Sequence, residues 1–290
     1  MSSSTGTVRV TLLVDDESEG RLVAEHGLCL WIRTSQRTVL LDSGQGPALA
    51  SNVARLGITL DSVQDLVLSH GHYDHTGGLP EVVKLAPSVH VHGHPQASRA
   101  RYSLRAGVAK PIGMPDTARS ALQSLPAQRL HWVTQAVRLD ETMGVTGPIP
   151  RIMDYEDTGG PFFLDSAGTH ADPIDDDLAL WIRTDAGLVV LVGCSHAGLI
   201  NTLRYAQNLA GCPRLHAVLG GFHLLEAGRK RIERTVQALV EMSPDWVIPC
   251  HCTGGRAVGA LADALGSRVR AGSAGAAFTF GTVTSPPREG

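Results

Sequence analysis

One short segment of the chain concentrates imidazole and carboxylate side chains. His70, His72, Asp74 and His75 stand within six residues, and Gly71 allows a tight turn between the first two. Neutral imidazole and ionised carboxylate are common ligands of Zn²⁺, Fe and Mn²⁺. The spacing predicts that His70 and His72 reach one metal ion and that Asp74 and His75 turn toward a second.

Three further histidines lie beside glycine or cysteine at the ends of apolar runs in the second half. A site for two metal ions needs ligands from both halves, so we expect His196 and His251 to complete the set. His223 follows a Gly-Gly-Phe turn, and we expect it to contact the substrate or to support a ligand. We count it as catalytic together with Asp74, which can be both a ligand and a proton acceptor. His170 is an alternative ligand, although its Ala-Asp-Pro surroundings are typical of a loop.

Apolar runs bounded by turn residues predict the strands and helices that carry these groups. In the first half, strands are predicted at 8–14, 28–34, 38–41 and 63–68, and helices at 47–56 and 79–85. In the second half, strands are predicted at 178–184, 188–191, 215–219 and 246–249, and helices from 199, at 231–242 and at 256–265. The histidine-rich segments therefore follow strands directly, where α/β proteins usually build their sites.

The two halves resemble each other. Leu-Cys-Leu-Trp-Ile-Arg-Thr at 28–34 returns as Leu-Ala-Leu-Trp-Ile-Arg-Thr at 178–184, and an apolar strand and a helix follow in both places. This internal repeat predicts a duplicated unit. Two such units, each with helices over one sheet face, would pack as a four-layer αββα sandwich forming one domain over residues 1–290. The proline-rich residues 95–170 are predicted to be an insertion or cap over the active site.

Composition limits the class of protein. The 290 residues are 43% hydrophobic with a formal net charge of −3, so the chain can bury a large core but lacks the basic excess that holds nucleic acid. It has no apolar run long enough for a membrane helix and no signal-peptide pattern, so we expect a cytoplasmic protein that does not bind membranes. The odd number of cysteines, five, predicts reduced thiols rather than a disulfide framework.

The His-x-His-x-Asp-His motif at 70–75 resembles that of the metallo-β-lactamase superfamily, whose αββα fold agrees with the duplication. Four segments are similar to the branch named for 7,8-dihydropterin-6-methyl-4-(β-D-ribofuranosyl)aminobenzene-5′-phosphate synthase; they lie at 69–79, 193–198, 220–224 and 249–254. The resemblance implies two groups of ligands. His70, His72 and His196 would hold the first metal, and Asp74, His75 and His251 the second.

The resemblance also assigns two supporting residues. Asp42 matches an aspartate that hydrogen-bonds a ligating imidazole, an arrangement that orients the ligand. Cys194 stands where many relatives have an aspartate that bridges the metals. This departure leaves open a thiolate ligand, a bridge made by water alone, or one tight and one weak metal site.

These features favour a metal-dependent hydrolase, in which two divalent ions share a water, lower its pKa and deliver hydroxide to the substrate. We expect Zn²⁺, with Fe or Mn as alternatives. One alternative function is a dihydropterin phosphate synthase-like transferase in pterin cofactor biosynthesis. Others are a non-catalytic metal-binding module and an oxygen-reducing di-iron protein, which would normally need a flavin domain or partner.

The expected partner is a small molecule, and a phosphate group on it is one option. Cationic side chains in the predicted insertion and a glycine-rich helix start could bind such an anion. The residues predicted to contact substrate are His94, Arg99, Arg101, Thr253 and Gly254. The sequence leaves the oligomeric state open.

Overall fold

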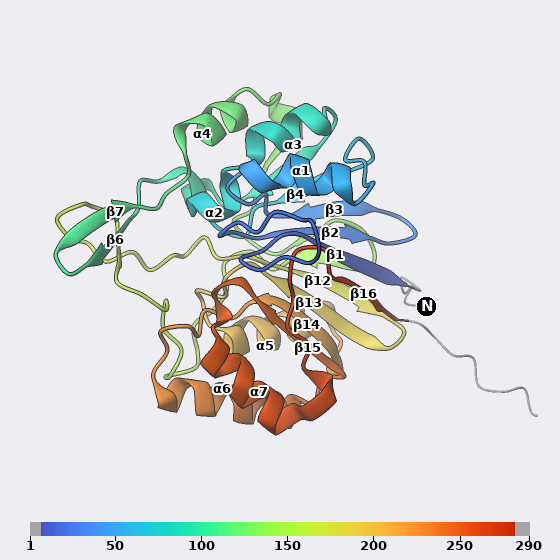
Figure 1. Ribbon diagram of the computed structural model, residues 1–290, viewed down its shortest axis with the longest axis vertical. Coiled ribbons are helices and arrows are strands. Elements are labelled where there is room, and N and C mark those ends of the chain that lie inside the picture. The colour runs from blue at the N-terminus through green and yellow to red at the C-terminus, as the bar shows by residue number, and fades with distance from the viewer. Residues whose placement is uncertain (1–6, 282–290) are drawn as a thin grey trace, which may run out of the picture.

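Two β-sheets lie face to face at the centre of the computed structural model, which describes residues 7–281 (Figure 1). In spatial order, the first sheet contains β16 (Ala277–Phe280), β1 (Val8–Val14), β2 (Cys29–Arg33), β3 (Thr38–Leu41), β4 (Asp65–Val67), β5 (His90–Gly93) and β8 (Leu130–Trp132). The second contains β15 (Trp246–Cys250), β14 (Leu215–Gly221), β13 (Gly187–Val192), β12 (Ala179–Thr184), β10 (Met143–Val145) and β9 (Val137–Arg138).

Helices cover the outer face of each sheet. The helices are α1 (Pro47–Arg55), α2 (Tyr73–Thr76), α3 (Leu79–Leu85), α4 (Asp116–Gln123), α5 (Leu199–Ala210), α6 (Arg229–Met242) and α7 (Gly255–Leu265). Figure 1 shows α1, α3 and α4 on one side of the sheets and α5, α6 and α7 on the other. The predicted four-layer αββα fold is confirmed.

Alternation along the strands explains why both faces of each sheet are apolar. In β2, Leu30 and Ile32 point into the core between the sheets, whereas Trp31 packs under the helices. In β13, Val189 lies in the central core and Val190 lies under α5. Strands that are buried on both faces read as continuous apolar runs, which made them visible in the sequence.

The sequence repeat corresponds to a structural one. The unit β2–β3–α1–β4–α3–β5 and the unit β12–β13–α5–β14–α6–β15 place their strands in the same order within their sheets. In each unit the last three strands run parallel, so their carboxyl ends share one edge. That edge carries the histidine-rich segments.

Residues 95–170 are only partly separate from the sandwich. The segment supplies α4, and it also supplies β8 to the first sheet and β9 and β10 to the second. A smaller sheet of β11 (Phe162–Phe163), β6 (Tyr102–Arg105) and β7 (Val108–Pro111) projects at one side of the molecule (Figure 1). Within residues 7–281, no helix has the length and apolar character needed to cross a lipid bilayer.

Candidate metal centre

The motif at 70–75 is half turn and half helix. His70 follows β4, and His72, in extended conformation, is the residue before α2. The predicted loop therefore ends in one helical turn, which carries Asp74 and His75. Gly71 packs so closely that a Cβ there would lie 2.0 Å from the Ala97 carbonyl oxygen, which explains the glycine between the first two histidines.

Asp42, just after β3, orients the first-half histidines. Its carboxylate accepts a hydrogen bond from the backbone N–H of Ser69 and another from the Ser69 hydroxyl, both at 2.7 Å. The carboxylate also accepts from His75 Nδ1 at 2.7 Å. The Ser69 oxygen in turn accepts from His70 Nδ1 at 2.9 Å. Both imidazoles therefore carry their proton on Nδ1 and leave Nε2 as the unprotonated nitrogen, which lies 2.9 Å from His72 Nδ1 in His70 and 3.1 Å from Cys194 Sγ in His75.

The second-half histidines are held in the same way. His196 Nδ1 donates to the Thr158 carbonyl oxygen at 2.7 Å, and His251 Nδ1 donates to Asp16 at 2.6 Å. The Nε2 atoms of both rings are buried and have no hydrogen-bond partner among residues 7–281. His72 Nε2 is likewise buried and without a partner there. His251 Nε2 also lies 3.5 Å from the Asp74 carboxylate, and although burial lowers the pKa of His251, Cys252, Asp16 and Asp74 together hold it above the usual range. The buried Nε2 atoms of His72 and His196 are what a bound metal ion would satisfy.

The six predicted ligands meet at one place. The ligand atoms of His70, Cys194 and His196 lie within 4.8 Å of one another, as do those of His75, Cys194 and His251. The rings of His72 and His196 are 4.9 Å apart between centroids. Asp74 Oδ2 lies 3.8 Å from His75 Nε2 and 3.5 Å from His251 Nε2. The donor set and its arrangement therefore fit two adjacent metal ions.

Burial sets the charge of these groups. It lowers the pKa of His70, His72 and His196 well below the usual range, so all three rings are neutral at pH 7. Burial raises the pKa of Asp74, but the neighbouring His75 and His251 outweigh this effect and hold it well below its usual range. Neutral imidazoles and an ionised carboxylate are the forms that bind metal.

Two site residues were missed from the sequence. Asp16 lies just beyond β1 and His26 precedes β2. His26 Nδ1 is 2.9 Å from Asp16 and its Nε2 is 3.2 Å from Asp74, and these two hydrogen bonds raise the pKa of His26 to about 9. The sequence did contain a signal for Asp16. The pair Asp15-Asp16 directly follows the first predicted strand, and other site residues also directly follow strands.

A buried ion pair braces the motif from outside the centre. Asp176 accepts a hydrogen bond from the Gly71 backbone N–H at 2.9 Å and another from Arg101 at 2.6 Å. Arg101 is 1% exposed, and its Nε lies 3.4 Å from Asp172. Arg101 was predicted to contact substrate, but its guanidinium is committed to these two carboxylates.

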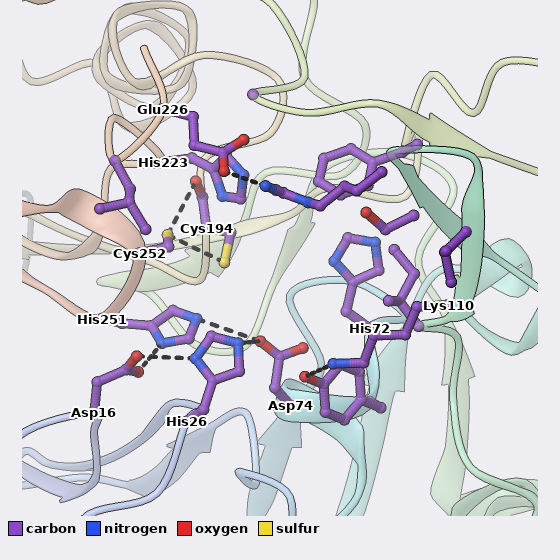
Figure 2. Close-up of a pocket in the computed structure, with 18 residues that line it drawn as sticks. Asp16, His26, His72, Asp74, Lys110, Cys194, His223, Glu226, His251 and Cys252 are labelled. Carbon is purple, nitrogen blue, oxygen red and sulfur yellow. Dashed lines mark hydrogen bonds and ion pairs between the residues drawn. The ribbon is translucent and has the colours of Figure 1, made fainter.

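A cavity of about 430 Å³ opens onto the centre (Figure 2). His72, Asp74, His223 and His251 of the centre line it together with the cation Lys110. Apolar and aromatic side chains complete the lining; they are Tyr73, Val108, Ile112, Phe162 and Leu225. The cavity thus combines metal-binding groups with a cation and an apolar wall.

The other predicted substrate residues lie away from this cavity. His94 is buried and its ring accepts a hydrogen bond from the Gln96 N–H, and Arg99 is exposed at the surface. Thr253 Oγ1 donates to the Cys250 carbonyl oxygen, and Leu225 covers Gly254 at the start of α7. None of the four lines the cavity. The alternative ligand His170 is an exposed side chain paired with Asp165.

His223 does line the cavity. Its ring centroid is 4.3 Å from that of His196, and Gly159 packs against the ring so closely that a Cβ there would lie 1.9 Å from His223 Cδ2. Its Nδ1 is buried and has no hydrogen-bond partner within residues 7–281. His223 therefore stands where it can act on a bound molecule or on the metal centre.

Cys194 lies between the two groups of predicted ligands. Its Sγ is 3.1 Å from His75 Nε2 and 3.3 Å from the Sγ of Cys252 (Figure 2). Burial raises the pKa of the Cys194 thiol. This position is compatible with a thiolate ligand, and the thiol of Cys252 lies directly beside it.

The chain is similar to known proteins over most of its length. The sequence model of the Metallo-beta-lactamase superfamily matches residues 22–251. The 7,8-dihydropterin-6-methyl-4-(beta-D-ribofuranosyl)-aminobenzene-5'-phosphate synthase of Methanocaldococcus jannaschii is 27% identical over 246 residues, which are 81% of this chain and 83% of that protein.

Solved structures share the fold. A metal-dependent hydrolase of the beta-lactamase superfamily superposes with a TM-score of 0.78 and 30% identity, covering 93% of this chain and 98% of the other. The Zn²⁺-bound PqqB of Methylobacterium extorquens superposes with a TM-score of 0.56 over 93% of this chain and 99% of the other. Its 11% identity carries information on the fold alone.

Proposed function

The chain belongs to the metallo-β-lactamase superfamily. We propose that it is a metal-dependent hydrolase that acts on a small anionic molecule with two divalent metal ions, for which Zn²⁺ is the preferred candidate. The observation that carries the proposal is the convergence of His70, His75, His196 and His251 around Asp74, each with Nδ1 held by an acceptor and Nε2 turned toward the other groups of the centre. Ligands fixed in this way are preorganised for metal.

The proposed ligands fall into two groups. His70, His72 and His196 would hold one ion, and Asp74, His75 and His251 the other, with Cys194 between them. Two divalent metal ions held this close together would lower the pKa of a bound water molecule and would stabilise negative charge that develops on the substrate. The buried neutral rings exclude bulk water from the centre and so strengthen that electrostatic effect.

Two residues are placed to move protons. Asp74 Oδ2 can accept a proton at the metal centre, as the sequence predicted. His26, protonated at pH 7 because its pKa is about 9, holds a proton on Nε2 3.2 Å from that oxygen. Its side chain is 50% exposed, so it can exchange protons with solvent. We assign His26 as the proton donor to a leaving group.

Two cations in the cavity lining favour an anionic substrate. Lys110 Nζ lies 5.1 Å from the centroid of the Tyr73 ring and donates to its hydroxyl at 3.3 Å. Arg105, paired with Glu226, stands beside it on the same hairpin. The two cations replace Arg99 and Arg101 as the proposed phosphate contacts, because they line the cavity and Arg99 and Arg101 do not.

The second candidate function is that of a transferase in pterin cofactor biosynthesis, which the name of the 27% identical dihydropterin phosphate synthase suggests. The aromatic wall of Tyr73 and Phe162 is the feature of the cavity that favours it, because planar rings stack on such side chains. A non-catalytic role is disfavoured, since all six ligand positions are intact.

The test is a substrate screen with metal-loaded protein. Phosphodiesters, lactones and thioesters are assayed for hydrolysis, and pterin phosphates for transfer. His72→Ala is the matched variant and should stay folded by circular dichroism, lose metal, and lose more than about 100-fold of any activity found. The control is His92→Ala, because His92 pairs with Asp65 outside the centre. This variant should keep both the metal and the activity. Full activity in His72→Ala would overturn the proposal.

A further inference from the structure

Three neighbouring strands of the second sheet end in residues that bind soft metals. β13, β14 and β15 are adjacent and parallel. Cys194, His223 and Cys252 are each the second residue after one of these strands. Because parallel strands bring their carboxyl ends to one edge, the same offset on three of them places the three side chains together.

The three ligand atoms form a compact group. They lie within 4.8 Å of one another, and Figure 2 shows the two thiols and His223 facing the cavity. Cys194 and Cys252 are buried. A Cβ at Gly221 would lie 2.6 Å from Cys252 Sγ, so the glycine that ends β14 leaves room for this thiol. His223 Nδ1, buried and partnerless within residues 7–281, adds an unsatisfied donor or acceptor.

The distance between the sulfur atoms favours a metal over a disulfide. Two thiolates on a tetrahedral zinc, each about 2.3 Å from it, stand about 3.8 Å apart. A disulfide bond is about 2.05 Å long. The observed separation of 3.3 Å is therefore closer to the metal-bound arrangement, and both cysteines are free.

We infer that Cys194, His223 and Cys252 form a thiolate–imidazole site for a thiophilic divalent cation such as Zn²⁺, which adds His223 and Cys252 to the centre beside the ligand groups of the proposed function. Two thiolates and a neutral imidazole balance the charge of one divalent ion, which lowers the cost of burying it. All three residues line the cavity, which would leave a fourth coordination position open to a molecule bound there, as in zinc sites that keep one position open. The inference concerns the same centre but does not depend on the proposed reaction.

Cobalt provides a test without any substrate. Reduced, metal-free protein is titrated with Co²⁺, and the near-ultraviolet thiolate-to-cobalt absorption is measured together with bound metal by mass spectrometry. We expect the wild-type band to fall by about half in Cys252→Ser and in Cys194→Ser, and to vanish in the double variant. Cys250→Ser, which alters a buried cysteine outside the group, is the matched control and should keep the full band.

A band of full intensity in Cys252→Ser would overturn the inference, because Cys194 alone would then account for it. A second measurement covers the case in which a serine variant fails to fold. Wild-type protein is alkylated with and without Cd²⁺, and the modified cysteines are located by peptide mass. Joint protection of Cys194 and Cys252 supports the site, and modification of Cys252 in the presence of Cd²⁺ refutes it. Neither result bears on whether a substrate is hydrolysed.

Discussion

At the scale of single residues, the centre depends on acceptors that fix where each imidazole carries its proton. Asp42 does this for the first half of the chain by binding His75 directly and His70 through Ser69. Asp16 does it for His251. Removing such an acceptor leaves the ligand in place but frees its ring to rotate and to carry the proton on the wrong nitrogen.

Asp42→Asn should therefore weaken metal binding by about 10- to 100-fold, because the amide cannot accept from all three of its present donors. Competition with a chromophoric chelator measures the change. Asp65→Asn is the matched control, since Asp65 also pairs with a buried histidine, His92, at 2.8 Å but lies outside the centre. Equal metal affinity in the two variants would contradict the role assigned to Asp42.

At the scale of elements, the small sheet is tied to the motif by a buried charge. Arg101, just before β6, bonds Asp176, and Asp176 bonds the Gly71 backbone between two ligands. The hairpin that covers the cavity is thereby linked to the turn that carries the ligands. Breaking one partner of a buried pair leaves an uncompensated charge.

Arg101→Met should cost about 3–5 kcal/mol of unfolding free energy, because Asp172 and Asp176 would remain buried without their cation. Arg99→Met, two residues away and exposed, should change stability by less than about 0.5 kcal/mol. Urea denaturation of both variants provides the comparison. A loss below about 1 kcal/mol in Arg101→Met would show that the ion pair is not structural.

Elements were predictable where hydrophobic patterning is local. The strands and helices of the repeat were found because their apolar runs are long. β8, β9 and β10 are two or three residues each, too short for a periodic signal. β16 was missed because it becomes a strand only by pairing with β1.

The site divides in the same way. The histidines of the motif at 70–75 were predictable because they stand within six residues of one another and directly follow a predicted strand. Asp16 accepts a hydrogen bond from His251, 235 residues away. No local sequence pattern predicts such a contact. Arg101 was predicted to contact substrate, and its structural role could not be seen because its two carboxylate partners come from a distant segment of the chain.

At the scale of the whole molecule, one dipeptide joins the two halves of the centre. Asp176 accepts from the Gly71 N–H in the first-half turn, and Asp177 accepts from the Ala197 N–H, beside His196, at 2.6 Å. The two carboxylates immediately precede the second copy of the repeat. They hold the ligand turns of both halves at a fixed separation.

This position makes the stability of the molecule depend on pH through Asp177. Burial raises its pKa from 3.8 to about 7, against the opposing effect of the Ala197 hydrogen bond. Between these two values the folded state binds a proton that the unfolded state has released. Stability must therefore fall as the pH rises through this window and level off above it.

Asp177→Asn keeps an acceptor for Ala197 and removes the titration. Relative to wild type, the variant should gain about 2–3 kcal/mol between pH 5 and pH 8, since one pKa unit corresponds to about 1.4 kcal/mol. Urea denaturation of chelator-treated protein at several pH values measures this gain. Asp263→Asn, an exposed aspartate on α7, should follow the wild-type curve. A difference between Asp177→Asn and wild type that stays constant with pH would mean that Asp177 is already ionised in the folded protein, and that its charge is stabilised by the turn it holds.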